Sequence, residues 1–145
     1  MTLANIYAPN NDDPVFFQRF FEPLQDFNGD EIIIGGDFNL LLDINKDKKG
    51  GFAKTHQNCA KVVQEYTHVL DLADAWRTLN QAEQKYTWRR KNPEIHCRLD
   101  FFLVSQTILN KTTTTDILPG YKTDHSLISI TISLHSNPRG RGSGS

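Results

Sequence analysis

The sequence is poor in the features that mark secreted, membrane-spanning and polycationic proteins. Its 145 residues contain two cysteines, Cys59 and Cys97, which form neither a CxxC pair nor a disulfide framework and so indicate a reducing compartment. No apolar run approaches the roughly 18 residues of a membrane-spanning helix, and the start MTLANIY lacks the charged region and apolar core of a signal peptide. The formal net charge of -1 provides no overall positive field for a nucleic acid. We therefore expect a nuclear or cytoplasmic protein without a membrane partner, in which any polyanion site must be local.

Patterns typical of strands and helices alternate along the chain. Strands are predicted at residues 3–7, 31–34, 85–89, 98–104, 112–117 and 126–134, and amphipathic helices at 15–27 and 57–70. Pro23 predicts a kink or an end in the first helix, and the lysine-rich residues 40–55 are predicted to form a long mobile loop. We expect an α/β (α+β) domain over residues 1–135, with one mixed β-sheet and helices on one face. Residues 136–145, rich in Gly, Ser and Arg, are predicted to be a disordered linker or tag.

The stretch EIIIGGDFN places a carboxylate and a carboxamide directly after an apolar strand. Asp37 and Asn39 are two residues apart, so on an extended chain they point to the same side. A carboxylate can accept a proton or hold a metal, and a carboxamide can donate to an oxyanion. Gly35 and Gly36 would let the backbone turn tightly and leave room for a phosphate. The alternative interpretation is an ordinary Asp/Asn turn after a strand.

Similar polar residues occur at other predicted strand ends. Asp100 lies within the apolar RLDFFLV, where a carboxylate needs a partner. Asp124 and His125 directly precede the last strand, and Tyr7 closes the first one. A lone histidine is more often structural, but these residues together predict a polar site at one end of a sheet.

Three motifs, in order, resemble those of the endonuclease/exonuclease/phosphatase superfamily, which includes deoxyribonuclease I and the apurinic/apyrimidinic endonucleases. They are NIYAPN at residues 5–10, GGDFN at 35–39, and RLDFFLVS…TDHS across 98–126. YTWRR and the tail NPRGRG further resemble the endonuclease domain of LINE-type non-LTR retrotransposons. The superfamily fold is a four-layer αββα sandwich, and the motifs match its C-terminal half.

The resemblance implies a role for each matching residue. Asp37 would orient or deprotonate the attacking water, and Asn39 would help to hold the scissile phosphate. His125 would donate to a phosphate oxygen while it pairs with Asp100, and Asp124 would lie near a divalent metal, Mg²⁺ or Mn²⁺. The remaining residues implied in phosphate or DNA contacts are Tyr7, Asn10, Thr87, Arg98 and Thr123, the last of which stands where the family usually has Ser.

The chain also departs from the family pattern. The asparagine motif and the Gln-Glu motif of the first half, whose glutamate is the main metal ligand, do not occur in it. We therefore expect a fragment of a Mg-dependent DNA endonuclease that nicks target DNA during retrotransposition, inactive or very weak in isolation. Its expected partners are DNA, the N-terminal half of the domain, or a second copy packed on the exposed sheet face.

Two other functions stay open from the sequence. The first is a phosphomonoesterase of the same superfamily, and the second is a non-catalytic remnant that acts as an assembly module. The basic runs at 46–49 and 89–91 fit either solvated loops or DNA contacts.

Overall fold

A four-stranded mixed sheet forms the centre of the chain, in a computed structural model that describes residues 1–27, 29–51, 55–120, 123–134, 139–140 and 142–143. Its strands, in spatial order, are β1 (Thr2–Tyr7), β2 (Ile32–Asp37), β7 (Asp100–Ser105) and β4 (Leu72–Asp74). β1 runs parallel to β2, whereas β7 is antiparallel to both β2 and β4. The mixed sheet predicted from the sequence is confirmed.

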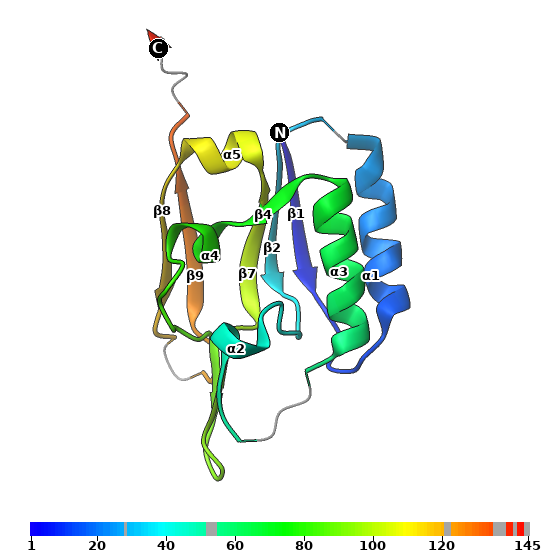
Figure 1. Cartoon of the computed structure of the whole chain (residues 1–145), viewed down its shortest axis with the longest axis vertical. Coiled ribbons are helices and arrows are strands. Elements are labelled where there is room, and N and C mark those ends of the chain that lie inside the picture. Colours follow the sequence, from blue (N-terminus) through cyan, green and yellow to red (C-terminus); the bar gives the residue numbers. More distant parts are fainter. Residues whose placement is uncertain (28, 52–54, 121–122, 135–138, 141, 144–145) are drawn as a thin grey trace.

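Two helices cover one face of this sheet (Figure 1). They are α1 (Pro14–Phe21), which is followed by the 3₁₀ helix η1 (Glu22–Phe27), and α3 (Gln57–Val69). The core between them takes alternate strand residues such as Ile34 and Leu103, because successive side chains of a strand point to opposite faces. The α-helix ends just before Pro23, as predicted from the ring's clash with the preceding turn. No helix among the described residues has both the length and the apolar character that crossing a bilayer requires.

The second face of the sheet is covered only in part. Its residues Ile33 and Val104 pack with Ile130 of an antiparallel hairpin. The hairpin and the short helices beside it are α4 (Ala75–Leu79), α5 (Gln106–Lys111), β8 (Thr112–Leu118) and β9 (Leu127–Ile132). Toward β1 the same face is open, and Leu3 is 71% exposed beside a shallow groove of about 320 Å³. The open area is largely apolar.

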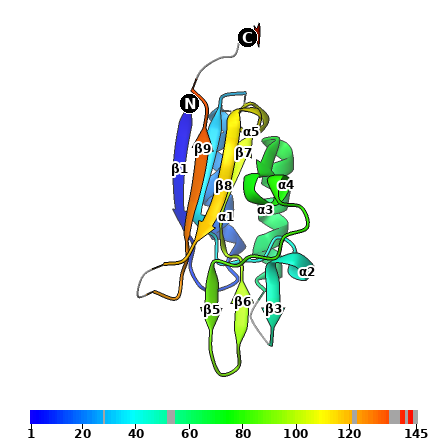
Figure 2. The same ribbon diagram turned by 90° about the vertical axis from the view of Figure 1, so that its left-hand side faces the viewer.

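A small three-stranded sheet extends from one end of the molecule (Figure 2). Its spatial order is β3 (Lys48–Gly50), β6 (Ile95–Cys97) and β5 (Trp88–Arg90), and the short helix α2 (Ile44–Asp47) leads into it. The prediction of a structureless loop over residues 40–55 is therefore wrong for 44–50, while 52–54 lie outside the described residues. The predicted linker over 136–145 also falls mostly outside them; within it, β10 (Arg139–Gly140) pairs with β11 (Gly142–Ser143).

The two glycines before Asp37 are required by packing. Gly36 has a φ of 140°, and a Cβ there would lie 2.0 Å from the carbonyl oxygen of Ile6 on β1. A Cβ on Gly35 would lie 2.6 Å from the ring of Phe102. The expectation that these glycines provide clearance for a phosphate is corrected, because the neighbouring strands occupy the space that a side chain would need.

Candidate active site

One row of residues across the central sheet carries three of the predicted site residues. Tyr7 on β1 is in register with Asp37 on β2, and Asp37 is in register with Asp100 on β7. Residues directly opposite one another share a face of the sheet. Their neighbours Ile6 and Phe101 are buried under the helices, so the row faces the other side, at the end of the sheet. The sequence prediction of a polar site at strand ends is thus matched by the backbone register.

His125 completes this group from the segment before β9. Its Nδ1 lies 3.0 Å from Oδ2 of Asp100, and its Nε2 lies 3.8 Å from Oδ2 of Asp37. One potential ligand atom from each of Asp37, Asp100 and His125 lies within 4.8 Å of the others. The imidazole is 33% exposed, whereas the carboxylates are 12% and 14% exposed. Two sheltered carboxylates and an accessible imidazole therefore meet at one point.

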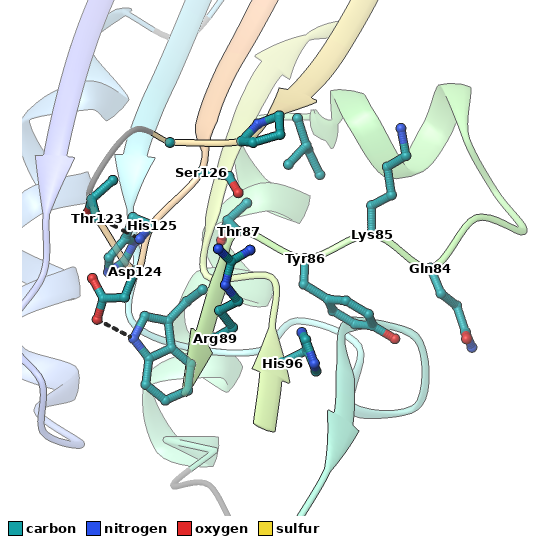
Figure 3. Close-up of a pocket in the computed structure, with 14 residues that line it drawn as sticks. Gln84, Lys85, Tyr86, Thr87, Arg89, His96, Thr123, Asp124, His125 and Ser126 are labelled. Atoms are coloured by element: carbon teal, nitrogen blue, oxygen red, sulfur yellow. Dashed lines mark hydrogen bonds between the residues drawn. The ribbon is translucent and has the colours of Figure 1, made fainter. Parts of the chain in front are cut away.

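The segment that carries His125 is held against β5. His125 forms an isolated antiparallel bridge with Trp88, and the backbone N–H of Ser126 donates to the carbonyl of Thr87. The carboxylate of Asp124, which Figure 3 shows beside Thr123 and His125, accepts from the indole N–H of Trp88 at 3.2 Å. The hydroxyl of Thr123 accepts from the backbone N–H of His125, also at 3.2 Å. Thr123 therefore orients the His125 backbone.

The electrostatics of the two carboxylates are unusual for aspartate. Burial, and next the nearby charge of Asp100, raise the pKa of Asp37 to about 6, against the smaller lowering effects of the Asn39 N–H and His125. Burial also raises the pKa of Asp100, although hydrogen bonds from Thr87 and His125 oppose the shift. The exposed Asp124 contributes to both shifts, so it lies within electrostatic reach of the pair. Asp37 can consequently exchange a proton close to neutral pH.

Asn39 joins three segments around the site. Its backbone N–H donates to Oδ1 of Asp37 at 2.9 Å, and its carboxamide donates to the carbonyl of Ala8 at 2.7 Å. Its own carbonyl accepts from Nδ1 of His56 at 2.6 Å, and its φ of 49° lies in the left-handed region that asparagine tolerates. The structure therefore shows Asn39 positioning Asp37.

Thr87 and Arg98, which the resemblance implies are DNA contacts, are both only 1% exposed. The Thr87 hydroxyl accepts from the backbone N–H groups of Leu99 and Asp100, at 2.9 and 3.0 Å. Arg98 donates through Nε and one terminal nitrogen to the carboxylate of Asp47. The predicted DNA contact of Arg98 is corrected, because its buried guanidinium is already paired with carboxylates. Thr87 lines the pocket beside His125, so its contact with DNA stays a prediction.

The ion pairs of Arg98 extend beyond Asp47. Its guanidinium also binds both oxygens of Asp74, and Arg77 reaches Asp47 at 2.6 Å. Burial opposes the charged form, but the carboxylates of Asp74 and Asp47 raise the pKa of Arg98 above its ordinary value. This buried network anchors the chain just before Asp100, and through it the site.

Two of the remaining predicted residues lie at the edge. Tyr7 is 81% exposed, and Asn10 is exposed in the loop that follows β1. Neither is drawn into the cluster by a side-chain hydrogen bond among the described residues, so both could meet a ligand only from the rim.

Several residues that support the site could not be expected from the sequence. His56 carried no ligand spacing, Asp47 stands in a lysine-rich run that reads as solvated, and Asp74 resembles a simple helix cap. Their partners, Asn39 and Arg98, lie far away along the chain. Only the residue type of Arg98, a cation among apolar residues, signals that carboxylates must be near.

A comparison with curated proteins finds a related transposon sequence. No family model matches the chain. Its sequence is 27% identical, over 137 residues, to the Transposon TX1 uncharacterized 149 kDa protein of Xenopus laevis, covering 91% of the chain but 10% of that relative's length.

Solved structures share the fold. A 3'-5' exonuclease, NExo, from Neisseria meningitidis superposes with a TM-score of 0.75 at 18% identity, covering 90% of this chain and 60% of its own. A Neisseria NExo variant described as a 3' phosphatase bound to product DNA hairpin gives 0.71 at 19% identity, with the same coverage. An AP endonuclease from Archaeoglobus fulgidus gives 0.74 at 16% identity, covering 91% of this chain and 61% of its own.

These findings confirm the fold that the motif resemblance implies. The fold corresponds to part of the endonuclease/exonuclease/phosphatase sandwich, and a related sequence belongs to a transposon protein. The chain spans 10% of the length of the curated relative and about 60% of the solved nucleases.

Proposed function

We propose that this chain, whose fold is that of the endonuclease/exonuclease/phosphatase superfamily, is part of a transposon-encoded endonuclease that nicks DNA by hydrolysing a phosphodiester bond during retrotransposition. The observation that carries the proposal is the convergence of Asp37, Asp100 and His125 within 4.8 Å from three separate segments. Two of them share a register position, and the third is held by β5. Structural packing alone does not require two carboxylates to be sheltered side by side, since burying them costs free energy.

The chemistry follows from the positions of these atoms. Asp37, with a pKa of about 6, accepts the proton of a water molecule as the water oxygen bonds to phosphorus and the bond to the leaving oxygen breaks. Asp100 accepts from Nδ1–H of His125 and so fixes the ring. His125 Nε2, on the open side, donates to a non-bridging phosphate oxygen when it is protonated.

The donor set fits a divalent cation. Asp37 and Asp100 are carboxylates, the ligands that Mg²⁺ and Mn²⁺ prefer, and the exposed Asp124 adds a third nearby. When bound, such a cation supplies charge neutralisation at the phosphate oxygens. Burial raises the pKa of both carboxylates, and a bound cation would oppose that shift. The family's main glutamate ligand would come from the first half of the domain.

A phosphomonoesterase is the second candidate, since one structural neighbour is described as a 3' phosphatase. Chromogenic substrates separate the two activities. With Mg²⁺, an endonuclease should hydrolyse bis(p-nitrophenyl) phosphate in preference to p-nitrophenyl phosphate, whereas a monoesterase reverses the preference. The proposal fails if Asp37→Asn hydrolyses both at the wild-type rate. Equal inactivity of wild type and variant would support the non-catalytic alternative.

We further propose that another β-sheet packs on the open face beside β1. The exposed Leu3 and the apolar groove that includes Phe102 and Ile128 support this. In the longer protein the occupant would be the N-terminal half of the domain, and for the isolated chain it would be a second copy.

A further inference from the structure

Two basic runs that are far apart in the sequence meet in the small sheet. Lys49 on β3 is in register with His96 on β6, and His96 is in register with Arg89 on β5. Since β6 lies between the other two strands, the three side chains form one row on one face of the sheet. Two strand spacings, roughly 10 Å, separate its ends. We call Lys49, His96 and Arg89 the basic row.

The buried core of the small sheet lies on the face opposite the basic row. The opposite face of the small sheet holds Ile95 and Cys97, which are buried with Leu41. Lys49 and Arg89 are both exposed, and neither takes part in an ion pair among the described residues. Two cations that form no ion pair among the described residues are therefore presented to solvent on one face, on either side of His96.

Arg89 and His96 of the basic row line a pocket that borders the candidate active site at Asp124 and His125. Figure 3 shows Arg89, His96 and Tyr86 around the same pocket as Asp124 and His125. The pocket measures about 280 Å³ and is open to solvent. A nucleic-acid strand bound in this pocket at His125 would therefore continue over the basic row.

One acidic residue opposes a polyanion on this face. Glu94 accepts from Nε2 of His96 at 2.8 Å, and this hydrogen bond is the main reason why the pKa of Glu94 lies below its ordinary value. Glu94 is 74% exposed, and it accepts the hydrogen bond that the His96 imidazole would otherwise donate to a phosphate.

We propose that the basic row binds the phosphodiester backbone of duplex DNA beside the bond to be cleaved. The proposal rests on the function proposed above and assigns a binding surface to it. Lysine and arginine bind backbone phosphates and release condensed counterions, which makes affinity dependent on salt. Because the net charge of the chain is -1, binding depends on this local arrangement.

Fluorescence anisotropy with a short labelled duplex tests the surface without catalysis, in EDTA. Lys49→Glu and Arg89→Glu should each weaken binding about 10-fold and lower the slope of log affinity against log salt by about one. Lys61→Glu makes the same charge change on the exposed face of α3 and should stay within about 2-fold of wild type. Glu94→Gln should tighten binding, since it removes the competing anion.

The controls separate this inference from the proposed function. Lys49→Gln and Arg89→Gln avoid new negative charge and, with unchanged circular dichroism, should still weaken binding. Asp37→Asn should bind DNA at least as tightly as wild type. If the row variants bind like Lys61→Glu, the inference is wrong even where Asp37-dependent hydrolysis is found. If binding depends on the basic row but no hydrolysis is found, the DNA-binding inference stands and the proposed nuclease function is rejected. Stronger competition by single-stranded RNA than by duplex DNA would overturn the assignment to DNA.

Discussion

Nδ1 of His125 lies 3.0 Å from Oδ2 of Asp100, which leaves Nε2 directed toward Asp37 at 3.8 Å. The carboxylate thereby selects the ring tautomer and its orientation, and it also places a second negative charge beside Asp37. Asp100 thus influences both Asp37, the proposed base, and His125, the proposed phosphate ligand.

The pH dependence of hydrolysis should reveal this coupling. If Asp37 acts as the base, the rate should rise with pH through about 6 and level off once the carboxylate is ionised. Asp100→Asn should move this transition to lower pH, since it removes a charge that raises the pKa of Asp37, and should lower the plateau by about 10²- to 10⁴-fold. A pH profile measured with the chromogenic diester, with no movement of the transition in Asp100→Asn, would contradict the assignment.

Asp37 should also reduce stability at neutral pH. Its pKa is about 6 in the folded chain against an ordinary 3.8, so the folded state binds more protons and stability falls as pH rises through this interval. Asp37→Asn should therefore be about 1–3 kcal/mol more stable than wild type at about pH 7.5, with little difference near about pH 4. Urea unfolding at both pH values checks this prediction. If the difference in stability between Asp37→Asn and wild type did not depend on pH, the pKa of Asp37 would not be raised in the folded chain.

The role of Arg98 can be tested by stability and binding together. Arg98→Met leaves the buried Asp47 and the Asp74 carboxylate without their main cation, which should lower the free energy of unfolding by about 3–5 kcal/mol. Arg98→Lys keeps the charge and should lose less. Arg90→Met, at an exposed position, should change stability by about 0.5 kcal/mol or less. If Arg98→Lys bound DNA more weakly at unchanged stability, this result would support the phosphate contact that the resemblance implies for Arg98.

Light scattering tests the open sheet face. We expect the isolated chain to form dimers, and Leu3→Lys to convert them to monomers because a charge on this face would be buried without a partner. Val69→Lys, at a 53% exposed apolar position on α3, is the matched control and should leave the dimer intact. A well-folded wild-type monomer at all concentrations would reject the second copy as occupant.

Local patterns predicted much of the fold. The strand of three isoleucines, both long helices and the last hairpin follow from hydrophobic periodicity and lie within a few residues of the expected positions. β4, β6 and α2 were missed because they are three or four residues long and are stabilised by partners distant in the sequence. The loop interpretation of residues 44–50 failed for the same reason.

Some residues of the candidate site could likewise be predicted from the sequence, and others could not. Asp37, Asp100 and His125 could be predicted because polar residues at strand ends are conspicuous and strand order brings them together. The burial of Arg98 and Thr87 could not be predicted, since it depends on Asp47, Asp74 and the β5 segment folding over β7. Likewise, the row of Lys49, His96 and Arg89 exists only through the register of the small sheet.

Nicking of supercoiled plasmid in Mg²⁺, compared between wild type, Asp37→Asn and His125→Asn, tests the central claim most directly. The account predicts slow conversion to open circles by the wild-type chain and none above background by either variant, while all three retain the same circular dichroism. Equal nicking by all three would show a contaminating nuclease and contradict the claim. Absence of nicking in every sample, at high concentrations of folded protein, would contradict the slow nicking predicted here and support a non-catalytic role for the isolated chain.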